Sequence, residues 1–279
     1  MTLPMTDPVR RAVSHLLSAL ATSVALTAAA GPATAQQLPA DVAARLVSSE
    51  LGDDGWTVRA EQAPSAALLD ELGRARRVVE EFFGAPYPEP LAITVAPDRE
   101  TFTAVLRAEW GVPETECWMV ATGVADFVVM LSPHRWSDQA CEHDPGDDQH
   151  RFGLLVHELT HAYHGQRNPT RDFTGAEEVG WFAEGLAVLV AGQLERDRLA
   201  DPAEAIERGL APERLADAWS GRYRYAVSGS IVALIDREWG RRALIDLLGV
   251  TDQAAILARL GTTEPELLAR WRAAVTGGP

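Results

Sequence analysis

Short apolar runs in the first half of the chain predict the strands of a small sheet. Residues 91–96 and 124–132 are apolar at almost every position, a pattern typical of buried strands. Residues 56–60 are a third candidate strand, directly after a Gly-Asp-Asp-Gly turn signal. We expect these three segments to form the sheet of the N-terminal part.

Helical spacing accounts for the stretches between these strands. In residues 65–83 the apolar side chains recur at helical spacing, and a run of three prolines then ends the helix. Asp98 precedes a second helix at 99–110, where its carboxylate can accept hydrogen bonds from the free N–H groups of the first turn. A shorter helix is expected near residues 40–51.

The second half of the chain is helical in pattern. The expected helices span residues 151–165, the apolar segment 180–187, a segment that starts after Asp201, residues 222–240, and two or three small helices within 241–275. The chain therefore divides into a sheet-containing part at 36–166 and a helical part at 167–279, which indicates the α+β class.

One of these helices contains His157-Glu158-Leu159-Thr160-His161. Residues four apart share a helix face and lie about 6 Å apart along its axis, so His157 and His161 can bind one Zn²⁺ together. Glu158 points aside, where it can take a proton from a metal-bound water without being a ligand. The spacing therefore supplies two ligands and a general base. The competing interpretation is an amphipathic helix with two surface histidines.

Glu184 is the candidate for the third ligand. It is the only acid within the apolar stretch 181–189, and a lone carboxylate is costly to bury unless it is paired or metal-bound. It follows His161 by 23 residues (184 − 161), enough for a turn and a returning helix. A zinc site of two histidines and one glutamate leaves a fourth coordination position for water.

The His-Glu-Leu-Thr-His motif, followed by Trp-Phe-Ala-Glu-Gly-Leu-Ala at 181–187, resembles the gluzincin metallopeptidases, in particular the thermolysin-like peptidase MA-like families. The resemblance covers roughly residues 90–250 and rests mainly on these two motifs. It implies a thermolysin-like zincin fold, with a small mixed sheet and the active-site helix in the first lobe and a mostly helical second lobe. It also implies that His157, His161 and Glu184 bind zinc and that Glu158 is the base.

The chain departs from these families at Val188. Many relatives carry an acid four positions after the ligand glutamate, where it orients a ligand histidine. Another residue must provide that support here, and the sequence does not say which.

The resemblance also extends to an oxyanion donor and to the substrate strand. Tyr225 is the candidate to face the metal and donate to the oxyanion, with Tyr223 in reserve, although either tyrosine could be a packing aromatic. In gluzincins the last strand before the zinc helix is the sheet edge beside the cleft, so residues 124–132 could pair with an extended peptide. The same run is equally compatible with a core strand.

Two aromatic residues near the end of the zinc helix need a separate interpretation. His164 stands seven positions after His157, on the same helical face, where it could contact substrate or support a ligand. We favour the simpler interpretation that it interacts with the helix dipole near the C-terminus. Tyr163 is expected in the core.

The N-terminus predicts a signal peptide at residues 1–35. Arg10 and Arg11 precede an apolar run at 12–30, and an Ala-Thr-Ala signal ends at Ala35. A membrane anchor is the competing interpretation, but the strongly apolar part is short and rich in Ala, Ser and Thr. No Cys follows Ala35 to carry a lipid. The Arg-Arg pair is a hint of twin-arginine export, and we expect a secreted or other extracytoplasmic protein with no membrane attachment after cleavage.

The net charge of the chain limits the classes of partner that it is expected to bind. The formal net charge is −15, and residues 1–35 contribute +1, so the mature chain of 244 residues (279 − 35) carries −16 (−15 − 1). Such an excess of acid argues against binding to nucleic acid or to anionic membranes. The sequence contains no lysine, which excludes Schiff-base and lysine-base chemistry.

Cys117 and Cys141 are the two cysteines, and an even count in an exported chain predicts one disulfide. It would close a span of 24 residues (141 − 117). The alternative is a metal site at Cys141 and His143. Residues 136–149 are polar and acidic and are expected to form a loop; a calcium site there is the less favoured alternative, because the acids lack a regular ligand spacing.

Together these features predict an exported zinc metallopeptidase with one Zn²⁺ per chain and peptides or proteins as substrates. One alternative is a zinc-binding protein without turnover that recognises a partner, an interpretation that the missing acid at Val188 allows. Another is a structural domain without metal. The sequence lacks the Gly-x-Met-x-Asn segment that binds substrate N-termini in gluzincin aminopeptidases, which disfavours that activity.

Overall fold

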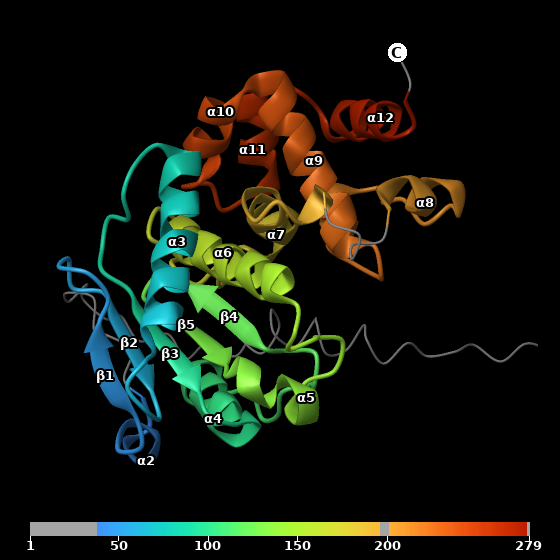
Figure 1. The fold of residues 1–279 in the computed structure, drawn as a ribbon. Coiled ribbons are helices and arrows are strands. Elements are labelled where there is room, and N and C mark those ends of the chain that lie inside the picture. The colour runs from blue at the N-terminus through green and yellow to red at the C-terminus, as the bar shows by residue number, and fades with distance from the viewer. Residues whose placement is uncertain (1–37, 196–200, 278–279) are drawn as a thin grey trace, which may run out of the picture.

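The computed structural model describes residues 38–195 and 201–277, so the predicted signal peptide at 1–35 lies outside it. Five strands form one mixed sheet in the order β1-β2-β3-β5-β4 (Figure 1). The strands are β1 (Val47–Glu50), β2 (Thr57–Ala60), β3 (Ala92–Ala96), β4 (Ala121–Val124) and β5 (Phe127–Leu131). The central strands β2, β3 and β5 are parallel, and both outer strands run antiparallel to their neighbours.

Both faces of the sheet are covered, which explains the continuous apolar runs of β3 and β5. In β5, Val128 and Met130 point into the larger core, while Phe127, Val129 and Leu131 point into a second core on the opposite face. Helices α3 (Ala66–Phe83) and α6 (Asp148–Gly165) pack on the first face, and α4 (Arg99–Trp110) with the short α2 (Ala40–Ala43) packs on the second.

The remaining helices pack beyond α6 (Figure 1). They are α7 (Gly180–Val190), α8 (Pro202–Glu207), α9 (Arg224–Trp239), α10 (Arg241–Leu247), α11 (Gln253–Leu260) and α12 (Glu264–Val275). Helix α7 lies between α6 and α9 and contacts both. The larger core runs from Leu51 to Trp271, so the sheet and the C-terminal helices share one apolar interior.

Most of the expected elements are confirmed. Helices α3, α4 and α9 match the predicted stretches, and Asp98 caps α4 by accepting a hydrogen bond from the Thr101 N–H at 2.7 Å. Helix α8 starts after Asp201, and three small helices close the chain. The observed folding class is the expected one, a helix-rich α+β structure with a small mixed sheet.

Three expectations are wrong in detail. The helix predicted at 40–51 ends at Ala43, and its second half is strand β1, which pairs with β2. The strand predicted at 124–132 is interrupted, because Ala125 and Asp126 form the turn of the hairpin that joins β4 to β5. The loop expected at 136–149 begins with the short helix α5 (Trp136–Gln139), whose Trp136 is fully buried.

The predicted disulfide between Cys117 and Cys141 is present, so the cysteine thiolate that a Cys141–His143 metal site requires does not exist. The disulfide ties the segment before β4 to the loop before α6. A search of the described residues finds no helix long and apolar enough to cross a membrane.

Candidate metal centre

Two close backbone contacts, one between β4 and α6 and one between α7 and α9, bring the predicted ligands together. A Cβ atom at Gly123 would collide with the backbone carbonyl of Glu158, so only glycine allows β4 to lie this near α6. A Cβ atom at Gly185 would collide with the carbonyl of Ser228, so glycine also allows α7 to lie against α9. The sheet edge, α6, α7 and α9 therefore meet around one point.

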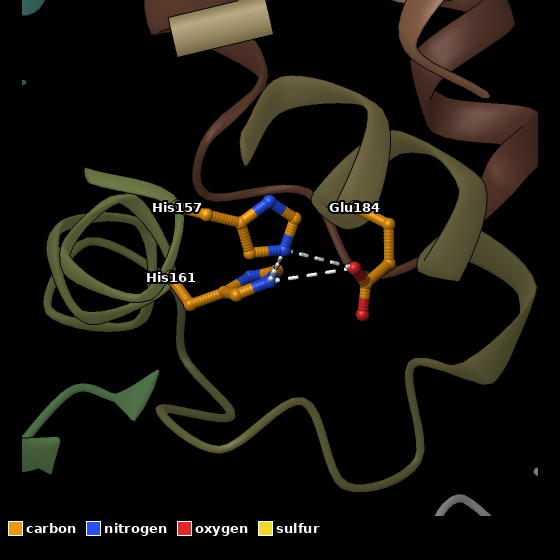
Figure 2. Close-up of side chains that lie close together, drawn as sticks. All are labelled: His157, His161 and Glu184. Atoms are coloured by element: carbon orange, nitrogen blue, oxygen red, sulfur yellow. Dashed lines mark hydrogen bonds and ion pairs between the residues drawn. The ribbon is translucent and has the colours of Figure 1, made fainter. Parts of the chain in front are cut away.

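His157, His161 and Glu184 converge at this point, as Figure 2 shows. The two imidazole Nε2 atoms are 3.1 Å apart, and Glu184 Oε2 lies 3.3 Å from His157 Nε2 and 3.5 Å from His161 Nε2. Within residues 38–195 and 201–277, this is the single cluster of three or more His, Cys, Asp or Glu side chains able to hold a metal ion. The structure thus brings together the three ligands predicted from sequence.

Gln193 supplies the support that Val188 does not. It lies just after α7, in the short turn Gln193–Glu195, and its Oε1 is 2.9 Å from His157 Nδ1. Val188 is fully buried, and a Cβ at Gly229 of α9 would strike its side chain. Position 188, where the resemblance leads us to expect an acid, therefore packs against α9, and the amide of Gln193, nine residues after Glu184 (193 − 184), contacts His157 instead.

The donor atoms fit a metal cation. When Gln193 Oε1 accepts the Nδ1–H of His157, the Nε2 of that neutral ring keeps a free lone pair. This lone pair points at His161 Nε2 and at a carboxylate oxygen of Glu184. The three atoms can share protons as hydrogen bonds or surround a cation, and two imidazoles with one carboxylate are a donor set that zinc accepts.

Electrostatics keep Glu184 ionised. Burial alone would raise the pKa of its carboxyl group, but the neighbouring His161 and His157 outweigh burial and hold that pKa well below its usual range. Glu184 is therefore a carboxylate at every physiological pH, as a metal ligand must be.

Glu158 has the opposite environment. Burial raises the pKa of its carboxyl group to about 7; the neighbouring His157 opposes the rise, Glu184 adds to it, and a hydrogen bond from the Gly123 N–H opposes it. A carboxyl group with this pKa can both accept and release a proton near neutral pH. Glu158 lies near His157 and Glu184 and is not one of the three residues that could hold a metal ion.

Tyr225 lines the same site from α9. Its ring centroid is 6.1 Å from that of His157. Burial raises the pKa of its hydroxyl group above the usual value, and the charge of Glu184 adds to the rise, so the group stays protonated and can donate. The reserve candidate, Tyr223, instead packs within the larger core. Of the two tyrosines, Tyr225 is the one in contact with a ligand.

His164 does not interact with the helix dipole as a cation, contrary to our expectation. It is buried between Phe173 and Phe182, with ring centroids 4.8 Å and 5.7 Å away, and its Nε2 lies 3.0 Å from the Leu248 carbonyl. Burial lowers its pKa to about 3, so the ring is neutral and links α6 to the segment after α10. Tyr163 lies in the core as expected and stacks on Phe83.

The sheet edge beside α6 is β4 and not the longer predicted strand. β5 lies between β3 and β4, so it is the core strand of the alternative interpretation. The Leu131 N–H donates to the Val120 carbonyl at 2.7 Å. From this pair onwards, hydrogen-bonded and non-hydrogen-bonded residue pairs alternate along β4 and β5. The backbone polar groups of Ala121 and Gly123 therefore point away from β5, towards the site.

Comparison with known proteins yields no matching family model and no matching curated protein.

Proposed function

We propose that the chain is an exported zinc metallopeptidase that hydrolyses peptide bonds, with a thermolysin-like arrangement of sheet edge, zinc helix and ligand helix. The observation that carries the proposal is the convergence of His157, His161 and Glu184 on one point, with Glu158 and Tyr225 beside it. The zincin motif alone would fit any metal-assisted hydrolysis. The edge strand along the site favours an extended peptide as the substrate.

The residues of the site have distinct roles in the proposed reaction. A bound Zn²⁺ would acidify a coordinated water and polarise the scissile carbonyl. Glu158 takes a proton from the attacking water and later gives it to the leaving nitrogen, a double role that suits a pKa near neutrality. The Tyr225 hydroxyl donates a hydrogen bond to the oxygen on which negative charge develops. Gln193 holds His157 in the tautomer that leaves Nε2 free.

The substrate backbone would pair with β4. Ala121 and Gly123 present outward-facing backbone groups, and the Gly123 N–H already donates to Glu158. A peptide strand added here would carry its scissile bond past the metal ligands. The disulfide fits the proposed extracytoplasmic location, because such bonds persist in oxidising compartments.

Gln193 also weakens the alternative of a zinc-binding protein without turnover. The absence of an acid at position 188 allowed that alternative, and Gln193 Oε1 lies 2.9 Å from Nδ1 of His157, one of the candidate ligands. No other observation favours a site that binds metal without catalysis.

Metal content and the Glu158→Gln variant test the proposal. We expect about one zinc ion per purified chain, cleavage of casein or of a mixed peptide library, and removal of both properties by a strong chelator. Glu158→Gln should keep the zinc and lose at least about 100-fold in kcat, the usual contribution of a general base. Equal activity of the variant and the wild type would refute the role of Glu158, and a chain without zinc would refute the metal site.

A further inference from the structure

Arg224, the first residue of α9, lies at one end of the candidate site. Its guanidinium carbon is 5.2 Å from the ring centroid of Tyr225, which itself contacts His157. It is 5.5 Å from the ring of Trp219 and 5.6 Å from that of Trp118. Trp118 belongs to the segment before β4, so the contact between Arg224 and Trp118 joins α9 to the sheet side and closes that end of the site.

The guanidinium has no carboxylate partner among the described residues. The ion pairs of this part of the chain leave Arg224 out, and its Nε is shielded from solvent without a hydrogen-bond partner. Arg224 also forms a hydrogen bond with the Tyr225 hydroxyl, which stays protonated and therefore supplies no negative charge. Because Arg224 is half-buried, a carboxylate that reached its guanidinium would gain a charge-assisted hydrogen bond that is partly shielded from water.

Arg222, two residues earlier, shows the ordinary arrangement. It also lies over an aromatic ring, that of Tyr223 at 4.8 Å, but its side chain is 64% exposed and lies 3.9 Å from Glu204. Stacking on an aromatic ring is therefore common to both arginines. Among the described residues, what distinguishes Arg224 is the lack of an ion pair with an acid and its contact with Tyr225, the ring that lies beside His157.

The direction of β4 indicates which part of a peptide would reach Arg224. β4 runs from Ala121 to Val124, and Trp118 precedes it. A peptide added antiparallel to β4 runs the other way, so its C-terminal side ends at Trp118 and Arg224. A peptide added in parallel would bring its N-terminal ammonium group to the guanidinium, and two cations would repel each other.

We infer that Arg224 binds a carboxylate of the substrate on the C-terminal side of the scissile bond. The inference rests on the proposed peptidase function and adds the substrate class to it. The planar guanidinium matches a carboxylate through two parallel hydrogen bonds, and the surrounding rings hold it in place. Two groups of a peptide have this chemistry, the terminal α-carboxylate and the side chain of Asp or Glu.

Matched peptides separate these sources. In the first pair, N-acetylated peptides of one sequence end in a free acid or in an amide. In the second pair, amidated peptides carry Asp or Asn after the scissile bond. For the wild type we expect kcat/KM to be about tenfold higher, or more, for the carboxylate member of one pair, the value of a charged hydrogen bond. Equal values within both pairs would overturn the inference while leaving the peptidase function in place.

Arg224 variants assign the preference to this residue. Arg224→Gln should reduce the carboxylate preference to about one, and Arg224→Lys should keep only part of it, because lysine retains the charge but loses the planar pair of donors. Arg222→Gln is the matched control and should keep the full preference. Zinc content and thermal midpoint confirm that each variant is folded. If Arg224→Gln does not fold, Arg224→Lys supplies the comparison. A preference that both Arg224 variants retain would overturn the assignment.

A binding measurement makes the inference independent of turnover. Titration calorimetry of the Glu158→Gln protein with the same acid and amide peptides should show about tenfold tighter binding of the carboxylate member, and Arg224→Gln should remove the difference. If the wild type cleaves no peptide but this difference remains, the peptidase proposal fails and carboxylate recognition stands. If neither cleavage nor a difference in binding is found, both fail.

Discussion

Replacing Gln193 by alanine tests how the site orients its metal ligand. The substitution removes the partner of His157 Nδ1 at 2.9 Å, and the side chain of that histidine is only 7% exposed. Its N–H would be left largely without a partner, which costs about 1–3 kcal/mol. Loss of the residue that orients a metal-binding histidine lowers metal affinity by about 10–100-fold, equivalent to roughly 1.4–2.8 kcal/mol. The two ranges overlap, so we expect zinc to bind about 10–100-fold more weakly.

A competition titration with a chromogenic chelator measures this effect. Gln193→Glu is the informative second variant: a carboxylate in place of the amide makes His157 more basic and should bind zinc at least as tightly as the wild type. Gln62→Ala is the control variant, because Gln62 is exposed and is distant from Gln193 in the sequence, so its loss should leave zinc affinity unchanged. Zinc affinity of Gln193→Ala within about twofold of the wild type would show that the contact does not support the ligand.

Three further predictions concern the base, the buried histidine and the disulfide. Glu158→Gln should bind zinc as the wild type does but lose at least about 100-fold in kcat, measured on a peptide that the wild type cleaves. Because burial lowers the pKa of His164 from 6.5 to about 3, its contribution to stability is complete above pH 6.5 and declines as pH falls towards 3. Between pH 6.5 and 5, urea unfolding should show about 2 kcal/mol of stability lost from this group, a loss absent in His164→Gln; equal losses in both proteins would contradict the assignment. Replacing Cys117 and Cys141 by serine opens a loop of 24 residues and should lower the unfolding free energy by about 3 kcal/mol. Reduction of the disulfide in the wild type should lower it by the same amount.

The three candidate metal ligands could be predicted from sequence because each has a local signal. His157 and His161 are one helical turn apart, so a correct helix assignment is enough to place them on one face. Glu184 is distant in sequence, but an acid in a strongly apolar segment needs a partner, and that cost is visible without a structure. Tyr225 depended on the resemblance, and its place beside His157 follows from how α9 packs on α7.

The fold errors arose where tertiary contacts override local pattern. Residues 47–50 continue a helical stretch in sequence, yet they pair as β1 with β2, and pairing outweighs a weak helical preference. The run at 124–132 contains only one acid near its start, so the two-residue turn at Ala125 and Asp126 had no glycine or proline to reveal it. His164 was assigned to a helix end on position alone, and its burial depends on Phe173, Phe182 and Leu248 from later segments.

Val188 and Gln193 show why a motif alone can misjudge such a site. The turn of α7 after Glu184 must lie close to α9, where Gly229 leaves room for the branched side chain of Val188 and none for a solvated carboxylate. An acid at this position would be buried against α9 without a partner, at a cost that removes the benefit of orienting the histidine. The hydrogen-bond acceptor for His157 lies instead in the turn after α7, on Gln193. The face of α7 at Val188 is therefore free to pack against α9, while Gln193 contacts the histidine. The absence of an acid at position 188 is therefore a consequence of tight packing between α7 and α9, and it carries no information about whether the site is catalytic.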